Sequence, residues 1–550
     1  MIIFIIFSIF IFLISCLFRF LGGPFFYGNN SDPSYFYLFN FYNINIGKSP
    51  EFIDHPGATL DVLGAGVMKS LFLFKSNITF GQVIPIAETL LGLVWLLMQL
   101  FYIGTLVILA NYTYRKSQDK IFTFLVLLNS LWLIIVPSFR SLSVQPISAN
   151  VNSDTMMMVA VNLMLITVIR FYFSQKQGSF SHPLFMGLAV AFAVATKFTA
   201  LPYLGVAFFL LINWRQRTMF IVLFVSAFLV FIYPIWGEHE HIFSWVKGLV
   251  VAKGFHGTGG EGFNLDGYLI NMMWVIQKHW FFVVLWVAAI VVGIKKSRVL
   301  VALGIGGILQ MIMVAKQPSY QYMAPMIGLS SVVLAIAYRI CPELCLKGLK
   351  WIVVFITILS LILIGSRMYY LRQTTQQTQD ILKVINTQYA SCMICPFYRS
   401  STMGFSFVFW NRVLKRKDFS QEMKKQYPKF FYYDIFYSEF KTSDEKLVSF
   451  NMLHQANSCV LLYGSDGDPK KFEPWVVAKK VYTNEGSEAL YEVISARSKK
   501  GMEFLKYALL MSSQNNYKEA LQAAMVSQNL GCGEDLSKFI NILKQQIQGK

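Results

Sequence analysis

The sequence predicts an all-α polytopic membrane protein with about eleven transmembrane helices, followed by a small α+β domain outside the cytoplasm. Of its 550 residues, 55% are hydrophobic and 14% are charged, whereas a soluble domain has about 25% charged residues. The net charge of +19 does not indicate nucleic-acid binding, because the basic residues punctuate apolar segments instead of gathering on one polar face. Composition therefore favours an integral membrane protein without a nucleic-acid partner.

Apolar segments recur through the first two thirds of the chain at lengths close to the ~20 residues of a full span. The first segment is interpreted as a retained span rather than a cleaved signal peptide, because no small-residue cleavage site follows it. A more charged sequence follows the last segment, so we expect two domains, 1–365 and 366–550. The predicted spans are 1–20, 83–110, 121–137, 155–173, 183–196, 200–214, 219–236, 271–294, 299–314, 320–338 and 351–365.

Basic residues in the short loops predict the orientation. They are frequent in one alternating set of loops, whereas the opposite set contains little more than Arg140 and Lys316. Because cytoplasmic loops carry the excess of Lys and Arg, that first set and the N-terminus are placed in the cytoplasm. Segments 29–66 and 236–267 and the chain after 366 then lie outside, as expected for a bacterial inner-membrane protein. The basic set is Arg115, Lys116, Lys120, Arg170, Lys176, Arg215, Arg217, Lys295, Lys296, Arg298, Arg339, Lys347 and Lys350.

The second domain combines strand and helix patterns. Segments 432–441, 458–464 and 488–496 predict short strands, and the glycine- and aspartate-rich residues 464–469 predict a turn. The final part of the chain predicts helices, and 515–531 resembles the second helix of a tetratricopeptide repeat. Because one such unit cannot bury its own apolar face, we expect a helical pair that caps the domain.

Cys392 and Cys395 form a CxxC motif that fits either a disulfide or half of a metal site. Zinc is not expected, because no second CxxC and no histidine pair follows at a zinc-binding spacing. Outside the cytoplasm, disulfides among Cys392, Cys395, Cys459 and Cys532 are permitted. Free thiols without a role fit the sequence equally well.

The segment 29–66 concentrates acids in a chain otherwise poor in them. Charged groups at a membrane are costly, and they usually mark function. Asp32 stands in Asn-Asn-Ser-Asp-Pro just beyond the first span. It is a candidate catalytic base, and it also fits a helix N-cap with Pro33 at the first helical position. We expect the aromatic residues 35–45 to form a helix on the membrane surface.

Asp54 and His55 precede a rigid Pro-Gly turn in the same segment. Both side chains are able to polarise a hydroxyl or a phosphate, as a catalytic acid–base group does. Alternatively, Asp54 caps the membrane-associated helix expected over residues 59–73. The sequence favours neither role.

Asp154 and Lys197 are predicted at the same outer face as Asp32. Asp154 lies at the mouth of the fourth span, where it also belongs to a helix-capping signal with Asn152. Lys197 interrupts two apolar segments, and a lysine at this depth is expected to face the protein and bind an anion. That anion is either one of these acids, in a structural pair, or the phosphate of a ligand, which is slightly favoured.

Two further positions are candidates for substrate binding. Lys316 lies with Tyr320 in an outer turn, where phosphate binding and snorkelling towards lipid headgroups explain the lysine equally well. The loop 238–266 contains His256 and a glycine cluster that follows no strand, so the cluster is not a dinucleotide fingerprint. The histidines at 239 and 241 do not complete a metal-binding spacing. We expect this loop to be a mobile lid near the site.

Four motifs resemble the membrane-embedded GT-C glycosyltransferases, in particular bacterial members similar to protein mannosyltransferases and the lipid A aminoarabinose transferase. The turn KQPSYQYMAP (316–325) is also similar to a late outer turn of the family. The resemblance covers about the first 365 residues. The four motifs are SDPSYFYLFN (31–40), DHPG (54–57), NSDTMM (152–157) and VATKFTALPY (194–203).

The resemblance implies an inverting transfer of a sugar from a polyprenyl-phosphate-linked donor to a glycan, lipid or protein acceptor outside the cytoplasm. It assigns Asp32 as the base and Asp154 to a supporting role, and it requires no metal or other cofactor. Relatives often have Asp-Glu where this chain has Asp32-Pro33, so Asp54 or His55 is expected to compensate. Lys197 then stabilises the leaving phosphate.

Two rival hypotheses come from other classes of protein. A secondary transporter would use Asp32, Asp154 and Lys197 as a path for an ion or substrate, but no internal repeat of the kind found in transporters is visible. A non-catalytic assembly partner with a decayed site is the other rival, and Pro33 favours it.

Overall fold

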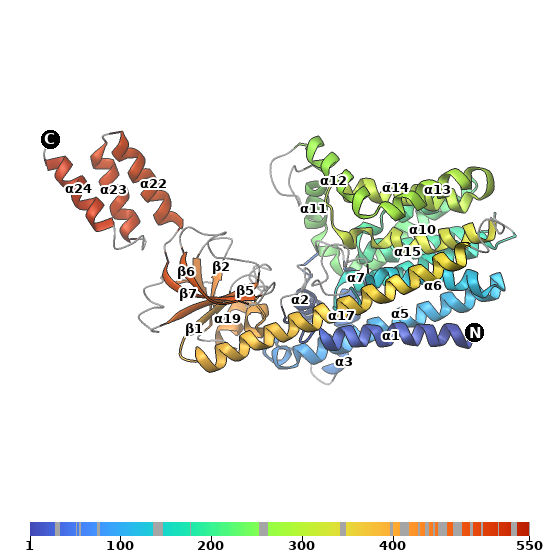
Figure 1. Cartoon of the computed structure of the whole chain (residues 1–550), viewed down its shortest axis with the longest axis horizontal. Coiled ribbons are helices and arrows are strands. Elements are labelled where there is room, and N and C mark those ends of the chain that lie inside the picture. The colour runs from blue at the N-terminus through green and yellow to red at the C-terminus, as the bar shows by residue number, and fades with distance from the viewer. Residues whose placement is uncertain are drawn as a thin grey trace. The chain divides into compact units, whose positions relative to one another are not determined.

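The computed structural model shows two compact units (Figure 1). It describes the chain except for residues 28–33, 51, 54–56, 74–76, 136–146, 176–177, 252–261, 341–347, 397–399, 408–416, 427–429, 435–438, 444–445, 449–458, 466–475, 484–487, 497–498, 515, 530–535 and 549–550. Unit 1 comprises Met1–Phe25 and Asn30–Arg372, and unit 2 comprises Phe26–Asn29 and Gln373–Lys550. The division lies after the predicted boundary at 365, because helix α17 (Gly348–Gln388) continues unbroken beyond its apolar half.

All the regular elements in the described part of unit 1 are helices, and each predicted span overlaps at least one of them. Its elements are α1 (Ile2–Leu21), α2 (Ser34–Asn45), α3 (Ala58–Leu71), α4 (Phe80–Val83), η1 (Ile84–Ile86), α5 (Ala87–Ser117), α6 (Lys120–Ile135), η3 (Ile147–Ala149), α7 (Ser153–Tyr172), α8 (Ser181–Thr196), η4 (Phe198–Ala200), α9 (Pro202–Leu210), α10 (Trp214–Ile232), η5 (Tyr233–Glu238), α11 (His239–Val251), α12 (Leu265–Lys278), α13 (Trp280–Lys296), α14 (Arg298–Ala315), η7 (Tyr320–Met323), α15 (Ala324–Ile340) and the start of α17.

Several of these helices are long and apolar enough to cross a membrane. Among the described residues, six pass on length and composition, and the pair α12 and α13, bent by 89°, makes a seventh if it is one span. Three shorter apolar helices are Lys120–Ile134, Ser181–Thr196 and Phe198–Leu210. The chain is therefore compatible with a multi-pass membrane protein, and the total of about eleven spans stays a prediction. The six are Ile2–Leu21, Phe80–Ser117, Ser153–Tyr172, Trp214–Glu238, Arg298–Ala315 and Tyr320–Ile340.

Helices α7 and α15 form the centre of the bundle. In each of their spans 78% of the residues are buried, against 17% in the span that contains α10. Helix α7 packs against α5, α8 and α15, and a Cβ on Gly328 of α15 would meet the side chain of Val161 on α7. Small residues let apolar helices approach closely where no hydrophobic effect separates helix from lipid. The helix hairpin α7–α8 is consequently held at the core, while α10 exposes an apolar surface suited to lipid.

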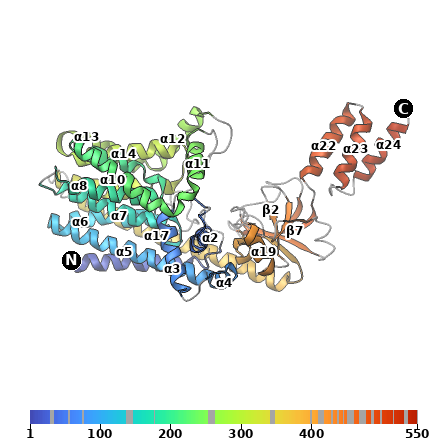
Figure 2. The ribbon, with the colours of Figure 1, turned by 180° about the vertical axis from the view of Figure 1, so that it is seen from behind.

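The aromatic segment after the first span is a helix, α2, but it does not lie on a surface. Every residue from Ser34 to Asn43 is buried, and α2 packs against α3. Its rings stack on neighbouring segments, as Phe36 does on Phe52 with centroids 4.2 Å apart. A helix that is apolar all round is enclosed by protein, whereas a surface helix needs one polar face. Figure 2 shows α2, α3 and α4 gathered at the end of the bundle opposite residue 1.

Unit 2 contains two small sheets. The first has the order β1-β5-β7-β6, with β1 parallel to β5 and the other pairs antiparallel. The second is antiparallel, in the order β2-β3-β4. Two of the predicted strand segments, 458–464 and 488–496, are confirmed as β5 and β7. The third, 432–441, was predicted as one strand but contains two antiparallel strands, β2 and β3, and β1, β4 and β6 were not expected. The strands are β1 (Met393–Pro396), β2 (Phe431–Asp434), β3 (Glu439–Thr442), β4 (Leu447–Val448), β5 (Val460–Ser465), β6 (Val476–Thr483) and β7 (Glu488–Ala496).

Side chains on the two faces of the larger sheet enter different cores. Leu462 and Val460 pack with Tyr433 and Phe440 of the smaller sheet. Leu461 and Tyr463 pack with Ile381 and Ile385 of α17. Successive side chains of a strand point to opposite faces of the sheet, so the residues of β5 enter the two cores alternately. The other helices of unit 2 are α19 (Lys417–Gln426), α22 (Lys499–Ser513), α23 (Tyr517–Asn529) and α24 (Leu536–Gln548), and the last three share an alanine-rich core.

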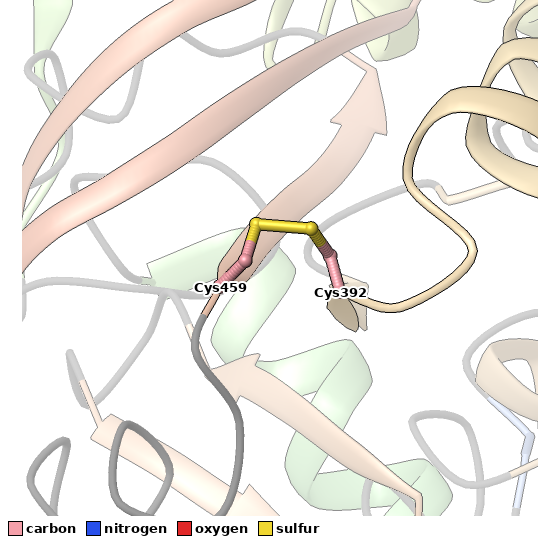
Figure 3. Close-up of a disulfide and its surroundings, with 2 residues drawn as sticks. All are labelled: Cys392 and Cys459. Carbon is pink, nitrogen blue, oxygen red and sulfur yellow. A yellow bond between two sulfur atoms is a disulfide. The ribbon is translucent and has the colours of Figure 1, made fainter.

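One disulfide joins Cys392 to Cys459 (Figure 3). It connects the start of β1 to the start of β5, where the backbone N–H of Met393 also donates to the carbonyl of Cys459. Cys395 is a free, fully buried thiol on the opposite face of β1, and burial raises its pKa to about 12. Of the pairings that the sequence permits, the structure contains Cys392–Cys459, which leaves the two cysteines of the CxxC motif unlinked to each other. Cys341, Cys345 and Cys532 lie outside the described residues.

Candidate functional site

A buried ion pair joins two of the predicted site residues. The Nζ of Lys197 lies 2.7 Å from Oδ1 of Asp154, and the two side chains are 0% and 5% exposed. The residues are far apart in sequence, but α7 begins at Ser153 and α8 ends at Thr196. Because α7 and α8 are packed antiparallel neighbours, the start of one helix meets the end of the other. The helical hairpin therefore brings the acid and the lysine together.

Both charges lie at the helix ends that favour them. Asn152 caps α7 by accepting a hydrogen bond from the backbone N–H of Thr155, which places Asp154 in the first turn. Lys197 ends α8 in an extended conformation. A helix N-terminus stabilises a negative charge and a C-terminus a positive one, typically by 0.3–1 kcal/mol each. The helix dipoles thus support the ion pair from both sides.

The turn that contains Lys316 and Tyr320 contributes a neighbouring residue to this pair. Nζ of Lys197 is 5.2 Å from the centre of the Tyr322 ring. Gln310 of α14 holds the two segments together, donating to the carbonyls of Thr199 and Tyr322 at 3.0 and 2.6 Å. Tyr322 was not among the predicted site residues. The sequence signal was its place in the outer turn, two residues beyond Tyr320.

Tyr320 and Lys316 themselves make other contacts. The Tyr320 ring meets the rings of Trp274 and His279, with centroids 4.8 and 5.6 Å apart. Nζ of Lys316 lies 5.1 Å from the centre of the Phe263 ring. Tyr320 therefore joins η7 to the bent pair of α12 and α13, and Lys316 contacts the segment that precedes α12.

Asp32, Asp54, His55 and His256 lie outside the described residues, but the segment that follows Asp32 is anchored at the ion pair. The hydroxyl of Ser34 accepts from the backbone N–H of Val151 at 3.2 Å. The hydroxyl of Tyr37 accepts from the N–H of Ser153 at 3.3 Å and donates to the Ser153 hydroxyl at 3.2 Å. Helix α2 is consequently tied to the turn that carries Asp154.

The segment that follows Asp54 and His55 is anchored beside Lys197. The backbone N–H of Gly57 donates to the carbonyl of Thr196 at 3.2 Å, and the hydroxyls of Thr59 and Thr196 are 2.8 Å apart. Gly57 adopts a left-handed conformation, with φ of 59°, which glycine enters without the steric cost of a side chain. The described residues that follow the two acidic motifs are therefore hydrogen-bonded to the two helix ends that form the ion pair.

Asp61 is a second buried acid close to these segments. Its side chain is fully buried in α3, and the amide of Asn40 donates to both carboxylate oxygens at 3.2 Å. The same amide donates to the carbonyl of Phe52, whose N–H donates back to Asn40. Burial raises the pKa of the Asp61 carboxyl well above its usual value, and the Asn40 hydrogen bond lowers it by less. Asp61 belongs to the acid-rich segment 29–66 and was not predicted as a site residue.

Glu88 was not predicted and anchors the end of the first span. Its carboxylate accepts from the backbone N–H of Phe25 and from the hydroxyl of Tyr35, both at 2.8 Å. Arg19 stacks its guanidinium 3.9 Å above the Phe25 ring and donates to the carbonyl of Ala149 at 2.8 Å. These contacts join α1, α2 and α5 to the segment that leads into Asp154. An acid in the first turn of a long apolar span was the available sequence signal.

We expect the contributions of Lys197 and Asp154 to the free energy of unfolding to depend on each other. Lys197→Met leaves Asp154 buried without its lysine, and Asp154→Leu leaves the lysine without its acid, so each change should lower the free energy of unfolding by about 3–5 kcal/mol. The double variant Lys197→Met/Asp154→Leu should lose much less than the sum of the two. Denaturant unfolding of the purified protein in detergent measures this, with Lys316→Met as the control. Additive losses would contradict the coupling.

We expect Asp61→Asn to remove a pH dependence of stability. Above the usual carboxyl pKa of about 3.9 the unfolded state ionises, whereas the buried carboxyl, with its raised pKa, keeps its proton. The free energy of unfolding of the native protein should therefore fall as the pH rises above about 3.9, by up to about 1.4 kcal/mol per pH unit. Thermal unfolding from pH 4 to 8 should show the variant gaining on the native protein as pH rises. A constant difference between the two would refute this.

No protein-family model and no curated protein sequence matches this chain. The resemblance to GT-C glycosyltransferases therefore rests on the sequence motifs, and the candidate site rests on its own geometry. That geometry is a buried Lys197–Asp154 pair at the joined ends of α7 and α8, with α2 and the start of α3 hydrogen-bonded to these two helix ends.

Proposed function

We propose that the chain is an inverting glycosyltransferase that moves a sugar from a polyprenyl-phosphate donor to an acceptor on the extracytoplasmic side of the membrane. The observation that carries the proposal is the buried pair of Lys197 and Asp154, together with the hydrogen bonds that hold Ser34 and Gly57, which follow the two acidic motifs in sequence, at the same helix ends. A buried ion pair is weak evidence for stability, because burying charges costs as much as their attraction returns. Ionisable groups kept inside a membrane bundle usually have a function.

The chemistry requires a base and a cation in one place. Asp32 takes the proton of the acceptor hydroxyl while the oxygen of that hydroxyl attacks the anomeric carbon of the donor sugar. The bond from that carbon to the phosphate oxygen breaks, and the polyprenyl phosphate leaves with the electron pair. Lys197 stabilises the leaving phosphate, with Lys316 as a second cation, and Asp154 holds the ammonium group until the donor binds. Asp54 and His55 are the alternative bases, and Tyr320 and His256 are substrate contacts.

The proposed location agrees with two independent features. Disulfides persist in oxidising compartments, so the Cys392–Cys459 bond supports an extracytoplasmic position for unit 2. The basic residues of the opposite loops favour the cytoplasm. A donor anchored in the membrane by its lipid then reaches the site from the bilayer, and the acceptor reaches it from outside.

Secondary transport is the second candidate, and interrupted helices favour it. The chain breaks between α8 and η4 at Lys197, and α12 and α13 meet at His279 with a bend of 89°. Transporters place substrate sites at such discontinuous helices. The transfer assay therefore needs an uptake measurement beside it.

We expect Asp32→Asn to abolish sugar transfer. Membranes containing the native protein or the variant are given radiolabelled polyprenyl-phosphate sugars, and labelled product is measured at equal expression. The matched control is Asp380→Asn, the same change at an exposed position of α17, which should retain full activity. Replacing a catalytic base should lower the rate by about 10²–10⁴-fold.

Two outcomes would change the assignment. Activity that survives in Asp32→Asn would move the base to Asp54, His55 or Asp154. A complete lack of transfer from several donors by the native protein, together with substrate uptake by proteoliposomes, would reject the glycosyltransferase in favour of transport.

A further inference from the structure

A cationic cavity lies where α9 ends and α14 begins. These ends of the two helices are the ones remote from Lys197. Lys197 precedes η4 and α9, whereas the cavity borders Phe209 near the end of α9 and the turn from α13 to α14. It is open, has a volume of about 530 Å³, and is lined by Lys295, Lys296, Ser297 and Arg298 among others. It is thus separate from the candidate active site.

Two arginines converge on one carbonyl beside this cavity. The chain turns to an extended conformation at Leu211, which leaves the last carbonyls of α9 without helical partners. Arg298 donates to the carbonyls of Phe209 and Leu211 at 2.6 and 2.7 Å, and Arg217 donates to the same Leu211 carbonyl at 3.2 Å. The two guanidinium groups therefore lie next to each other. Like charges this close repel, and an anion between them would relieve that repulsion.

Three of these cations have no carboxylate partner in the described part of the chain. Arg217, Lys295 and Arg298 form no ion pair with any carboxylate in the described part of the chain, where the ion pair is that of Lys197 with Asp154. Arg215 adds a further exposed positive charge to the same end. Ser297 precedes α14 without making a side-chain cap, so the backbone N–H groups of the first turn add partial positive charge. The positive-inside bias accounts for basic residues at this end, but not for two guanidinium groups sharing one acceptor.

The surroundings of the cavity are those of a lipid. Ile294 lines it and is 71% exposed. Val291, which precedes Ile294 on α13, is 64% exposed, and Trp214, which follows Leu211, is 69% exposed. Exposed apolar side chains next to a basic cluster fit acyl chains beneath a charged headgroup. A soluble anion has no apolar part that would contact these side chains. We propose that this cavity binds the phosphate of an anionic phospholipid in the leaflet at this end of the bundle. The proposal does not depend on the glycosyltransferase assignment.

Binding of two lipids to the purified full-length protein tests the proposal. Native mass spectrometry in detergent compares phosphatidylglycerol with zwitterionic phosphatidylcholine over a concentration series. The variant Lys295→Gln/Lys296→Gln removes two charges without touching the α9 cap, and Arg298→Gln removes a convergent arginine. The matched control is Arg115→Gln/Lys116→Gln, an exposed basic pair at the end of α5 outside the cavity lining.

We expect the native protein to bind phosphatidylglycerol in preference to phosphatidylcholine. The double lysine variant should weaken phosphatidylglycerol binding by roughly 10- to 30-fold, since each basic residue near an anionic headgroup strengthens binding several-fold. Arg298→Gln removes one charge and should weaken it by about 5-fold, and the control should stay within about twofold. Equal affinity for phosphatidylglycerol in all variants would overturn the site. Inorganic phosphate that binds as tightly as the lipid, and is lost with the same lysines, would overturn the lipid assignment in favour of a soluble phosphate.

Discussion

The fold of unit 1 places a positive and a negative charge in contact where water is excluded, and this buried pair determines the arrangement around it. Lys197 and Asp154 meet because α7 and α8 form a tight hairpin at the centre of the bundle. Breaking such a pair would leave a single buried charge, which costs several kcal/mol. Helix α2, the start of α3 and the η7 turn must therefore keep their positions around the pair, and their hydrogen bonds to Ser153, Thr196 and Gln310 do this.

If the proposed function holds, the same geometry would serve two states of the site. In the state described, the ammonium group of Lys197 is neutralised by Asp154 and lies near the Tyr322 ring. A phosphate that reaches the lysine would replace one anion by another, so the lysine is never left unpaired. Asp61 differs from Asp154, because its partner is a neutral amide and burial favours its protonated form. The two buried carboxyl groups thus have different partners, an ammonium group for Asp154 and a neutral amide for Asp61.

Much of the helical framework could be predicted from apolar periodicity, because span length and hydropathy are local properties of the chain. The partners of individual side chains could not. Whether Lys197 pairs with an acid or awaits a ligand depends on the α7–α8 hairpin, and the choice of Cys459 over Cys395 depends on which face of β1 each side chain occupies. The burial of α2 was missed because its aromatic residues are equally typical of a membrane interface. From the sequence, Arg217 and Arg298 indicate only the orientation in the membrane. Their contact could not be predicted, because it depends on the Leu211 carbonyl at the end of α9, which accepts from both.

The most direct measurement is the position of a bound polyprenyl phosphate in an experimental structure of the full-length protein. We predict that its phosphate lies in hydrogen-bonding contact with Nζ of Lys197, with the lipid leaving the site towards the bilayer and the contact between Lys197 and Asp154 lengthened. A phosphate bound elsewhere, with the Lys197–Asp154 pair intact at its present distance of 2.7 Å, would contradict the role of this pair as the phosphate site.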